Sequence, residues 1–231
     1  KAHRSVGTIG ILPTLITDAP EVMARAVEAM IELWGDEAVL GVHFEGPHIN
    51  PVKRGTHAEA FVRPMEQETK DHVRRLREHG VPVMLTLAPE CVSTSEIAEL
   101  AQLGVMVSLG HSNATADEAR SGLQAGAKVV THLYNAMSQM QGREAGLTGA
   151  AINSDAFVGI IADGYHVSPE MLALACRARP VRDRMFLVSD AMPTVAGPES
   201  FRLYDMEIRV ENGRLVNPEG ALAGAHVCMA E

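Results

Sequence analysis

Glutamate, aspartate and histidine residues stand at the ends of several short apolar runs, where they could bind a metal ion or move a proton. They are Glu45, His111, His132, His166 and Asp190. A single histidine in such a position is more often structural. Three histidines and two carboxylates in equivalent positions are hard to explain by packing, because buried groups of this kind need a partner to offset lost hydration. We therefore predict one polar cluster.

Histidine nitrogen and carboxylate oxygen are the ligands of a catalytic Zn²⁺, which takes three protein ligands and keeps one position for water. We predict that Glu45, His111 and His132 are these ligands, with Fe²⁺, Co²⁺ or Mn²⁺ as alternatives to zinc. Water on such an ion can attack a carbonyl carbon near pH 7. Asp190 is suited to accept its proton and to pass it to a leaving amine.

Three further polar residues lie close to Glu45 in the sequence. His43 shares a strand face with Glu45, because side chains alternate along a strand with a period of two. It could be a ligand, but we favour a role in orienting Glu45. His48 and Asn50 follow in a loop. We expect them to fix that loop rather than to contact a substrate.

Apolar runs rich in β-branched residues alternate with amphipathic stretches along the chain, which is typical of buried parallel strands joined by helices. The predicted strands are Val6–Leu15, Ala38–Gly46, Val81–Ala88, Gly104–His111, Lys128–Leu133, Phe157–Asp163 and Met185–Asp190. The predicted helices lie in Pro20–Gly35, in Met65–Gly80, and after the capping residues Ser93, Thr115 and Ser168.

This alternation favours a closed (β/α)₈ barrel over an open doubly wound sheet, because seven strand–helix steps follow one another. Such a barrel needs about 250 residues, so we expect one partial barrel domain over residues 1–231 that lacks its first strand. After Met192 the pattern changes, and residues 201–217 predict a β-hairpin insertion with a turn at Asn212-Gly213. In a barrel the polar cluster would lie at the C-terminal ends of the strands, where active sites of this fold form.

Composition and charge exclude several classes of function. The chain has 231 residues, of which 46% are hydrophobic and 21% charged, so it can bury a core. Its net charge of −9 argues against nucleic acid and anionic membranes as partners, although a small anionic substrate remains compatible. Three scattered cysteines form no disulfide framework. Neither a membrane span nor a signal peptide is visible, so we expect a cytoplasmic protein.

Five motifs follow one another along the chain. They are His-Phe-Glu-Gly-Pro-His-Ile-Asn-Pro at 43–51 with Lys-Arg-Gly-Thr-His at 53–57, Gly-His-Ser-Asn-Ala-Thr at 110–115, Thr-His-Leu-Tyr-Asn-Ala-Met at 131–137, Ala-Asp-Gly-Tyr-His-Val at 162–167 and Ser-Asp-Ala-Met at 189–192. In order and spacing the set resembles the N-acetylglucosamine-6-phosphate deacetylases of the amidohydrolase superfamily. The resemblance covers essentially the whole chain.

The resemblance implies a reaction and roles for further residues. The reaction is hydrolysis of N-acetylglucosamine 6-phosphate to glucosamine 6-phosphate and acetate in amino-sugar catabolism. His57 resembles the histidine that polarises the acetamide carbonyl, and Asn135 and the backbone of Ala136 resemble substrate contacts. His166 and Arg143 resemble the residues that bind sugar and phosphate. In this family the arginine reaches across a homodimer interface.

Two alternatives stay open beside this function. One is a sibling amidohydrolase that acts on N-acetylgalactosamine 6-phosphate or another N-acyl substrate. The other is an inactive, truncated fragment that binds sugar phosphates.

The resemblance also has departures at both ends of the chain. The chain opens at Lys1 on what resembles the helix before the second strand, so we expect the first strand and the terminal β-sandwich to be missing. In many relatives that first strand carries a histidine pair for a second metal. The Leu222-Ala223-Gly224 segment resembles the loop over the sugar, but Ala225 stands where the family has serine.

Overall fold

A parallel sheet, with its strands paired in the order in which they occur along the chain, forms the main body of the protein. It is described here by a computed structural model that covers residues 2–230. The seven strands are β1 (Thr14–Ile16), β2 (Val42–Glu45), β3 (Val83–Leu87), β4 (Met106–Leu109), β5 (Val129–Val130), β6 (Phe157–Ile160) and β7 (Met185–Leu187). Each predicted run after the first therefore contains one strand, shorter than the run itself, whereas β1 overlaps only the end of Val6–Leu15 and extends to Ile16.

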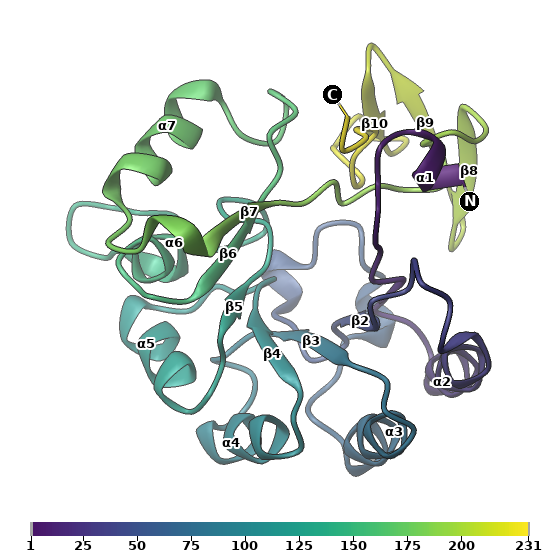
Figure 1. Cartoon of the computed structure of the whole chain (residues 1–231). Helices are drawn as coiled ribbons and strands as arrows, with labels where there is room; N and C mark the ends of the chain where they lie inside the picture. The colour runs from purple at the N-terminus through teal and green to yellow at the C-terminus, as the bar shows by residue number, and fades with distance from the viewer. Residues whose placement is uncertain (1, 231) are drawn as a thin grey trace.

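Helices cover the outside of this sheet (Figure 1). They are α2 (Pro20–Leu33), α3 (Gln67–Glu78), α4 (Thr94–Gln102), α5 (Ala116–Gln124), α6 (Gly146–Ile152) and α7 (Pro169–Ala178). The short helix α1 (Ala2–Ser5) lies apart from them, and the 3₁₀ turns are η1 (Pro51–Lys53), η2 (Glu59–Phe61) and η3 (Arg182–Arg184). The predicted caps are confirmed, because the side chains of Ser93, Thr115 and Ser168 accept hydrogen bonds from the first turns of their helices. Helix α6 was not predicted, since all its residues are buried and it has no side-chain cap.

The core lies between the sheet and the helices. Buried apolar residues alternate along β3 and β4 and belong to the same core cluster as the inner stripe of α2, formed by Met23, Val27 and Met30. Burial of each large aliphatic side chain stabilises the fold by about 1.5–3 kcal/mol.

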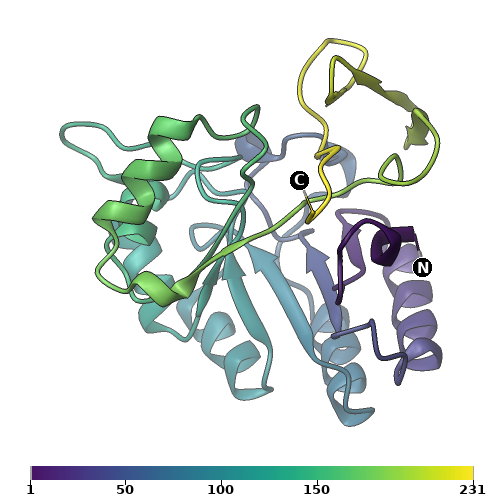
Figure 2. The same cartoon turned by 45° about the horizontal axis from the view of Figure 1, so that its top comes forward.

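The sheet curls into part of a barrel (Figures 1 and 2). Within residues 2–230, β7 does not pair with β1, so the curl is open between these two strands. The predicted α/β barrel type is thus confirmed, with seven strands where a complete barrel has eight. The predicted start at Lys1 lies outside the described residues. Within them, no helix is long and apolar enough to cross a membrane.

A small antiparallel sheet follows the barrel strands. It contains β8 (Ser200–Leu203), β9 (Met206–Glu211) and β10 (Arg214–Val216). The predicted hairpin at Asn212-Gly213 is confirmed, but residues 200–216 form two hairpins instead of the single one expected, because the run 201–210 is not one strand. A second turn at Tyr204, where φ is 52°, breaks that run into β8 and β9.

Two tyrosine hydroxyl groups attach this small sheet to the barrel. Tyr204 donates a hydrogen bond to the carbonyl oxygen of Thr17, just after β1. On the other side, Tyr165 donates to the carbonyl oxygen of Asn212 at 3.0 Å. The small sheet is therefore bonded both to the segment after β1 and to the segment after β6.

Candidate active site

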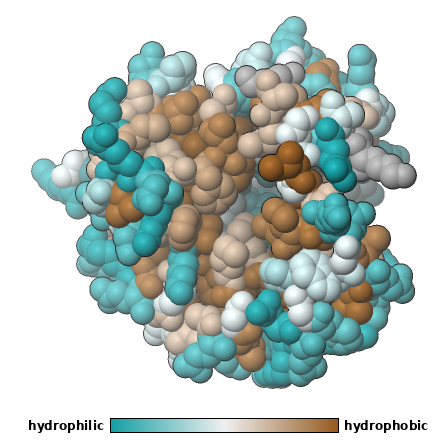
Figure 3. All heavy atoms as spheres, viewed as in Figure 1, coloured by the Kyte–Doolittle hydropathy of each residue, from teal (hydrophilic) through white to brown (hydrophobic). Residues whose placement is uncertain are grey.

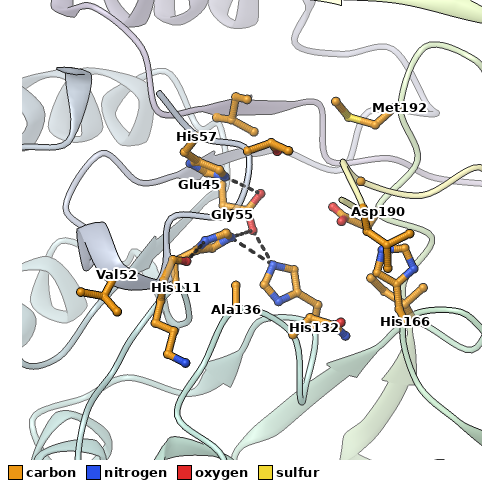
Figure 4. A pocket seen from close by; sticks show the side chains of 17 residues that line it. Glu45, Val52, Gly55, His57, His111, His132, Ala136, His166, Asp190 and Met192 are labelled. Atoms are coloured by element: carbon orange, nitrogen blue, oxygen red, sulfur yellow. Dashed lines mark hydrogen bonds and ion pairs between the residues drawn. The ribbon is translucent and has the colours of Figure 1, made fainter. Parts of the chain in front are cut away.

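One pocket collects the polar residues that follow the barrel strands (Figure 4). Glu45 is the last residue of β2, His111 and His132 follow β4 and β5, and His166 and Asp190 follow β6 and β7. All five line a cavity of about 310 Å³ at the C-terminal ends of the strands. The parallel topology explains this convergence, because it brings the carboxyl ends of all strands to the same face.

Glu45, His111 and His132 present three atoms to one another. His111 Nε2 lies 3.2 Å from Glu45 Oε1, His132 Nε2 lies 3.0 Å from the same oxygen, and the two nitrogen atoms are 3.2 Å apart. Ligands at about 2.0 Å from a tetrahedral ion are about 3.3 Å from one another. The three residues, only 4–5% exposed, therefore fit a single divalent ion.

The hydrogen bonding of His111 supports the same conclusion. Its Nδ1 donates to the carbonyl oxygen of Lys53 at 2.9 Å, so in the neutral ring Nε2 carries a lone pair. That lone pair faces the Glu45 carboxylate and His132 Nε2. Three electron-rich atoms so close together require a cation or shared protons between them.

Without a metal ion, protons fill this role. Burial alone would lower the pKa of His132, but its hydrogen bond to Glu45 and the charge of that carboxylate outweigh burial and raise the pKa to about 9. Burial alone would raise the pKa of Glu45, whereas its hydrogen bonds with His111 and His132 hold it well below its usual range. The site thus keeps a carboxylate ready for a cation.

His57 offers another set of donor atoms, since Glu45, His57 and His111 together present ligand atoms within 4.8 Å of one another. The backbone N–H of Thr17 points at His57 Nδ1, at 3.4 Å, so that nitrogen is an acceptor and Nε2 carries the proton. Burial, followed by the charge of His111, lowers the pKa of His57 to about 3, which keeps the ring neutral. His57 is therefore better suited to donate a hydrogen bond into the pocket than to bind a metal ion.

Asp190 faces the cavity from the opposite side (Figure 4). Its carboxylate has no hydrogen-bond partner within residues 2–230. Burial and the nearby charge of Glu45 raise its pKa above the usual range. A carboxylate with a raised pKa and no partner is suited to accept and return a proton.

His166 is held by Asp163 rather than by the pocket wall. The Asp163 carboxylate lies 2.6 Å from His166 Nδ1 and accepts the backbone N–H of His166 at 2.8 Å. The Nδ1 proton therefore points at Asp163, which leaves Nε2 as the nitrogen available to a ligand.

Several site residues have backbone conformations that are rare for residues other than glycine. The φ angles of His111, His132, Ala136 and Asp190 are 46°, 27°, 48° and 48°. Such conformations persist where the surrounding structure over-determines them, and they gather at functional sites. Gly46 is required directly after Glu45, because its φ is 82° and an added Cβ would lie 2.2 Å from Thr17 Oγ1.

The remaining predicted residues divide into two groups. Asn135, Ala136, Leu222 and Gly224 all line the pocket. Arg143 does not, because it lies exposed in the loop before α6 and makes no hydrogen bond or ion pair with the rest of residues 2–230. The pocket thus contains every predicted site residue except this arginine.

The prediction that His43 orients Glu45 is wrong. Its ring nitrogen atoms lie 3.1 Å from Thr14 Oγ1 and 2.7 Å from Thr86 Oγ1, so both are engaged elsewhere. The predicted structural role of His48 and Asn50 is confirmed. His48 bonds to the Arg63 carbonyl oxygen and to Thr69, and Asn50 bonds to Glu90.

Three residues with clear roles in the site were not singled out from the sequence. Thr17 contacts His57, the Lys53 carbonyl accepts from His111, and Asp163 holds His166. Lys53 and Asp163 lie inside the motifs quoted above, where a requirement for a partner on each histidine ring could have pointed to them. Thr17 carries no such signal, since only the fold brings it to His57.

The chain matches the model of the amidohydrolase family over residues 7–196. Among characterised proteins it is 39% identical to an N-acetylgalactosamine-6-phosphate deacetylase of Shewanella sp. (strain ANA-3), over 100% of this chain and 59% of that protein. It is 34% identical to an N-acetylglucosamine-6-phosphate deacetylase of Haemophilus influenzae, over 97% of this chain and 60% of that protein.

Solved structures that resemble this chain also come from N-acetylglucosamine-6-phosphate deacetylases. The N-acetylglucosamine-6-phosphate deacetylase of Pasteurella multocida superimposes with a TM-score of 0.89 at 36% identity, over 97% of this chain and 59% of that one. A variant of the Mycobacterium smegmatis enzyme in complex with N-acetyl-D-glucosamine-6-phosphate gives a TM-score of 0.90 at 30% identity, over 98% and 60%. The chain spans about three fifths of the length of these relatives.

Proposed function

This chain belongs to the amidohydrolase family, and from that premise we propose that it carries the metal-dependent deacetylase site of an enzyme acting on N-acetylglucosamine 6-phosphate. The observation that carries the proposal is the convergence of Glu45 Oε1, His111 Nε2 and His132 Nε2 at 3.0–3.2 Å from one another. His57 and Asp190 line the same cavity. The characterised relatives act on N-acetylated sugar phosphates, which supports the choice of substrate.

Glu45, His111 and His132 would hold the divalent ion, with zinc as the first choice for this donor set. When bound, such an ion supplies a water ionised near neutral pH and polarises a carbonyl group. The protein side chains provide the rest of the chemistry. His57, with a proton on Nε2, would donate a hydrogen bond to the oxygen of the acetamide carbonyl, where negative charge develops during attack.

Asp190 would move the proton of the reaction. It accepts the proton of the attacking water as the new carbon–oxygen bond forms, and it gives a proton to the nitrogen as the carbon–nitrogen bond breaks. The products are acetate and the free amine. A carboxylate without a fixed partner can serve both steps, because no hydrogen bond must be broken before each transfer.

The sugar would lie between the metal site and the Asp163–His166 pair. His166 Nε2 is free to contact a hydroxyl or phosphate oxygen, and Asn135 lines the same pocket. The cavity volume of about 310 Å³ is at the lower end of small-molecule pockets. It accommodates a single sugar ring better than an oligosaccharide.

Release of acetate from N-acetylglucosamine 6-phosphate tests this function. The protein is treated with a chelator, dialysed, and assayed with and without added Zn²⁺, Fe²⁺, Co²⁺ or Mn²⁺. We expect no turnover without metal and recovery with at least one of these ions. Full activity in the chelated protein, or no turnover by metal-loaded protein, would contradict the proposal.

A second substrate is favoured by a specific observation. The relative from Shewanella, at 39% identity, is named for N-acetylgalactosamine 6-phosphate. The two sugars differ only in the orientation of the hydroxyl group at C4, and the predicted metal ligands do not distinguish them. The ratio of kcat/KM for the two substrates, measured on one preparation, decides between these functions.

We further propose a homodimer in which Arg143 serves the phosphate of the neighbouring subunit. The exposed position of Arg143, outside its own pocket, supports this arrangement. Mixing an Arg143→Ala protein with an Asp190→Asn protein should restore activity by subunit exchange, because one site in each mixed dimer is intact. No recovery after demonstrated exchange would count against a shared site. The cytoplasmic location stays a prediction from the sequence.

A further inference from the structure

We propose that Glu90 is a positioning residue for His111, which it holds through both the backbone and the imidazole ring. Glu90 lies in the loop between β3 and α4 and does not line the pocket of the candidate site. The inference rests on the metal site of the proposed function, since it concerns how one predicted ligand is kept in place.

The Glu90 carboxylate accepts hydrogen bonds from two other loops. Its Oε1 accepts from Asn50 Nδ2 at 3.0 Å and from the backbone N–H of Asn113 at 2.5 Å. Its Oε2 accepts from Ser112 Oγ at 2.7 Å. Hydrogen bonds to a charged acceptor are stronger than neutral ones. One carboxylate therefore joins the loops that follow β2, β3 and β4.

The first connection from Glu90 to His111 runs through the backbone. His111 has a φ angle of 46°, which a histidine keeps only where its neighbours impose it. Ser112 and Asn113, which follow it directly, both donate to Glu90. The His111 carbonyl accepts the backbone N–H of Asn50 at 2.9 Å. The backbone of His111 is therefore held from both sides by residues bonded to Glu90.

The second connection runs to the imidazole ring. Because Asn50 donates its Nδ2 to Glu90, its Oδ1 is turned to accept the backbone N–H of Val52 at 2.9 Å. This bond begins the 3₁₀ turn η1, in which Lys53 N also donates to the Asn50 carbonyl. The carbonyl of Lys53 then accepts His111 Nδ1 at 2.9 Å. Glu90 thus also supports the group that fixes the tautomer of His111.

A second carboxylate in the same segment offers a matched control. Glu96 accepts hydrogen bonds from the backbone N–H and the Oγ of Ser93, at 3.1 and 2.7 Å. These bonds cap α4 and do not reach the loops after β2 or β4. Removal of Glu96 therefore tests the loss of an anchored carboxylate without the connection to His111.

The experiment measures Zn²⁺ affinity by chelator competition in the parent protein, in Glu90→Ala and in Glu96→Ala. Loss of a group that supports a ligand costs about 10–100-fold in metal affinity, and we expect this range for Glu90→Ala. For Glu96→Ala we expect a change within about twofold, the usual scatter between independent sites. Ser112→Ala removes one hydrogen bond to the Glu90 carboxylate with little risk to folding, and we expect about 10-fold weaker Zn²⁺ binding.

NMR of the metal-free protein provides a second measurement. The proton on His111 Nδ1 should be visible and slow to exchange in the parent protein and in Glu96→Ala, and it should be lost in Glu90→Ala. Parent-like zinc affinity and a retained Nδ1 proton in Glu90→Ala would overturn this inference but leave the proposed metal site intact. Equal losses of affinity in Glu90→Ala and Glu96→Ala would also overturn it. A parent protein that binds no zinc would overturn both this inference and the proposed metal site.

Discussion

The part of the barrel that carries the predicted ligands and the part that carries Asp190 differ in how their polar side chains are paired. Glu45 at the end of β2 and His111 after β4 are buried and bonded to each other, and the Lys53 carbonyl in a neighbouring loop accepts from His111. Asp190 follows β7, whose Phe186 and Leu187 are 42% and 56% exposed, and its carboxylate has no hydrogen-bond partner in the described part of the chain.

This contrast corresponds to two different chemical tasks. Metal ligands must be held at fixed positions, since a small displacement lowers affinity and weakens orientation of the substrate. A group that accepts and returns a proton must be free to change partners between steps. The pocket therefore has a restrained half, formed by the predicted ligands Glu45, His111 and His132, and on its other side the unpaired carboxylate of Asp190.

The largest effect is expected in the restrained half. Replacing His111 or His132 by alanine removes a ligand directly, so metal affinity should fall by more than the 10–100-fold that a supporting residue costs. Metal content and turnover should fall together. His79→Ala provides a matched control, because His79 is an exposed histidine bonded to the Arg75 carbonyl at the end of α3. Full metal occupancy in the double replacement would remove both residues from the ligand set.

Replacing Asp190, on the other side of the pocket, should have a smaller effect on metal binding but a large effect on the reaction rate. Asp190→Asn keeps the shape of the side chain and removes the proton acceptor, so kcat should fall about 10²–10⁴-fold. Metal content and KM should stay close to the parent values, as for an interaction that acts in the transition state. Activity within about threefold of the parent would be too small a loss for a general base. Loss of metal on the same sample would instead make Asp190 a ligand.

Weakening the attachment of the small sheet should have a modest effect. Tyr204→Phe removes the hydroxyl that donates to the Thr17 carbonyl, beside the contact of Thr17 with His57. Loss of one hydrogen bond should lower the free energy of unfolding by about 1 kcal/mol. Urea unfolding measures this change, and Tyr165→Phe tests the attachment at Asn212 in the same way. No loss of stability in either variant would show that neither hydroxyl group contributes to attachment.

The last effect concerns the pH dependence of stability and His48, in the loop after β2. Burial lowers the pKa of His48, so the folded protein keeps it neutral while the unfolded chain protonates it near pH 6.5. The unfolded state therefore binds more protons as the pH falls. The free energy of unfolding should decrease below about pH 6.5, with at most about 1.4 kcal/mol per pH unit from this residue. In His48→Gln the free energy of unfolding should differ less between pH 7.5 and pH 5.5 than in the parent protein. An unchanged difference would contradict the lowered pKa of His48 as its cause.

Much of this architecture could be predicted from the sequence because its signals are local. Apolar runs mark the parallel strands, and the capping boxes at Ser93 and Thr115 mark helix starts through bonds that span only a few residues. The break at Tyr204 was missed, although the alternation of apolar residues changes phase there, from Phe201 and Leu203 to Met206, Ile208 and Val210. The interaction of His43 with Thr14 and Thr86 was missed because strand register, not sequence spacing, brings them together.

Location of a metal ion in crystals tests the account most directly. Anomalous scattering at the zinc edge, from crystals grown with Zn²⁺, would show which side chains bind it. We predict one peak at about 2.0–2.2 Å from Glu45 Oε1, His111 Nε2 and His132 Nε2, with Asp190 and His57 outside bonding distance. A peak bound by His57 in place of His132, or none between these residues at full zinc occupancy elsewhere, would contradict the predicted metal site.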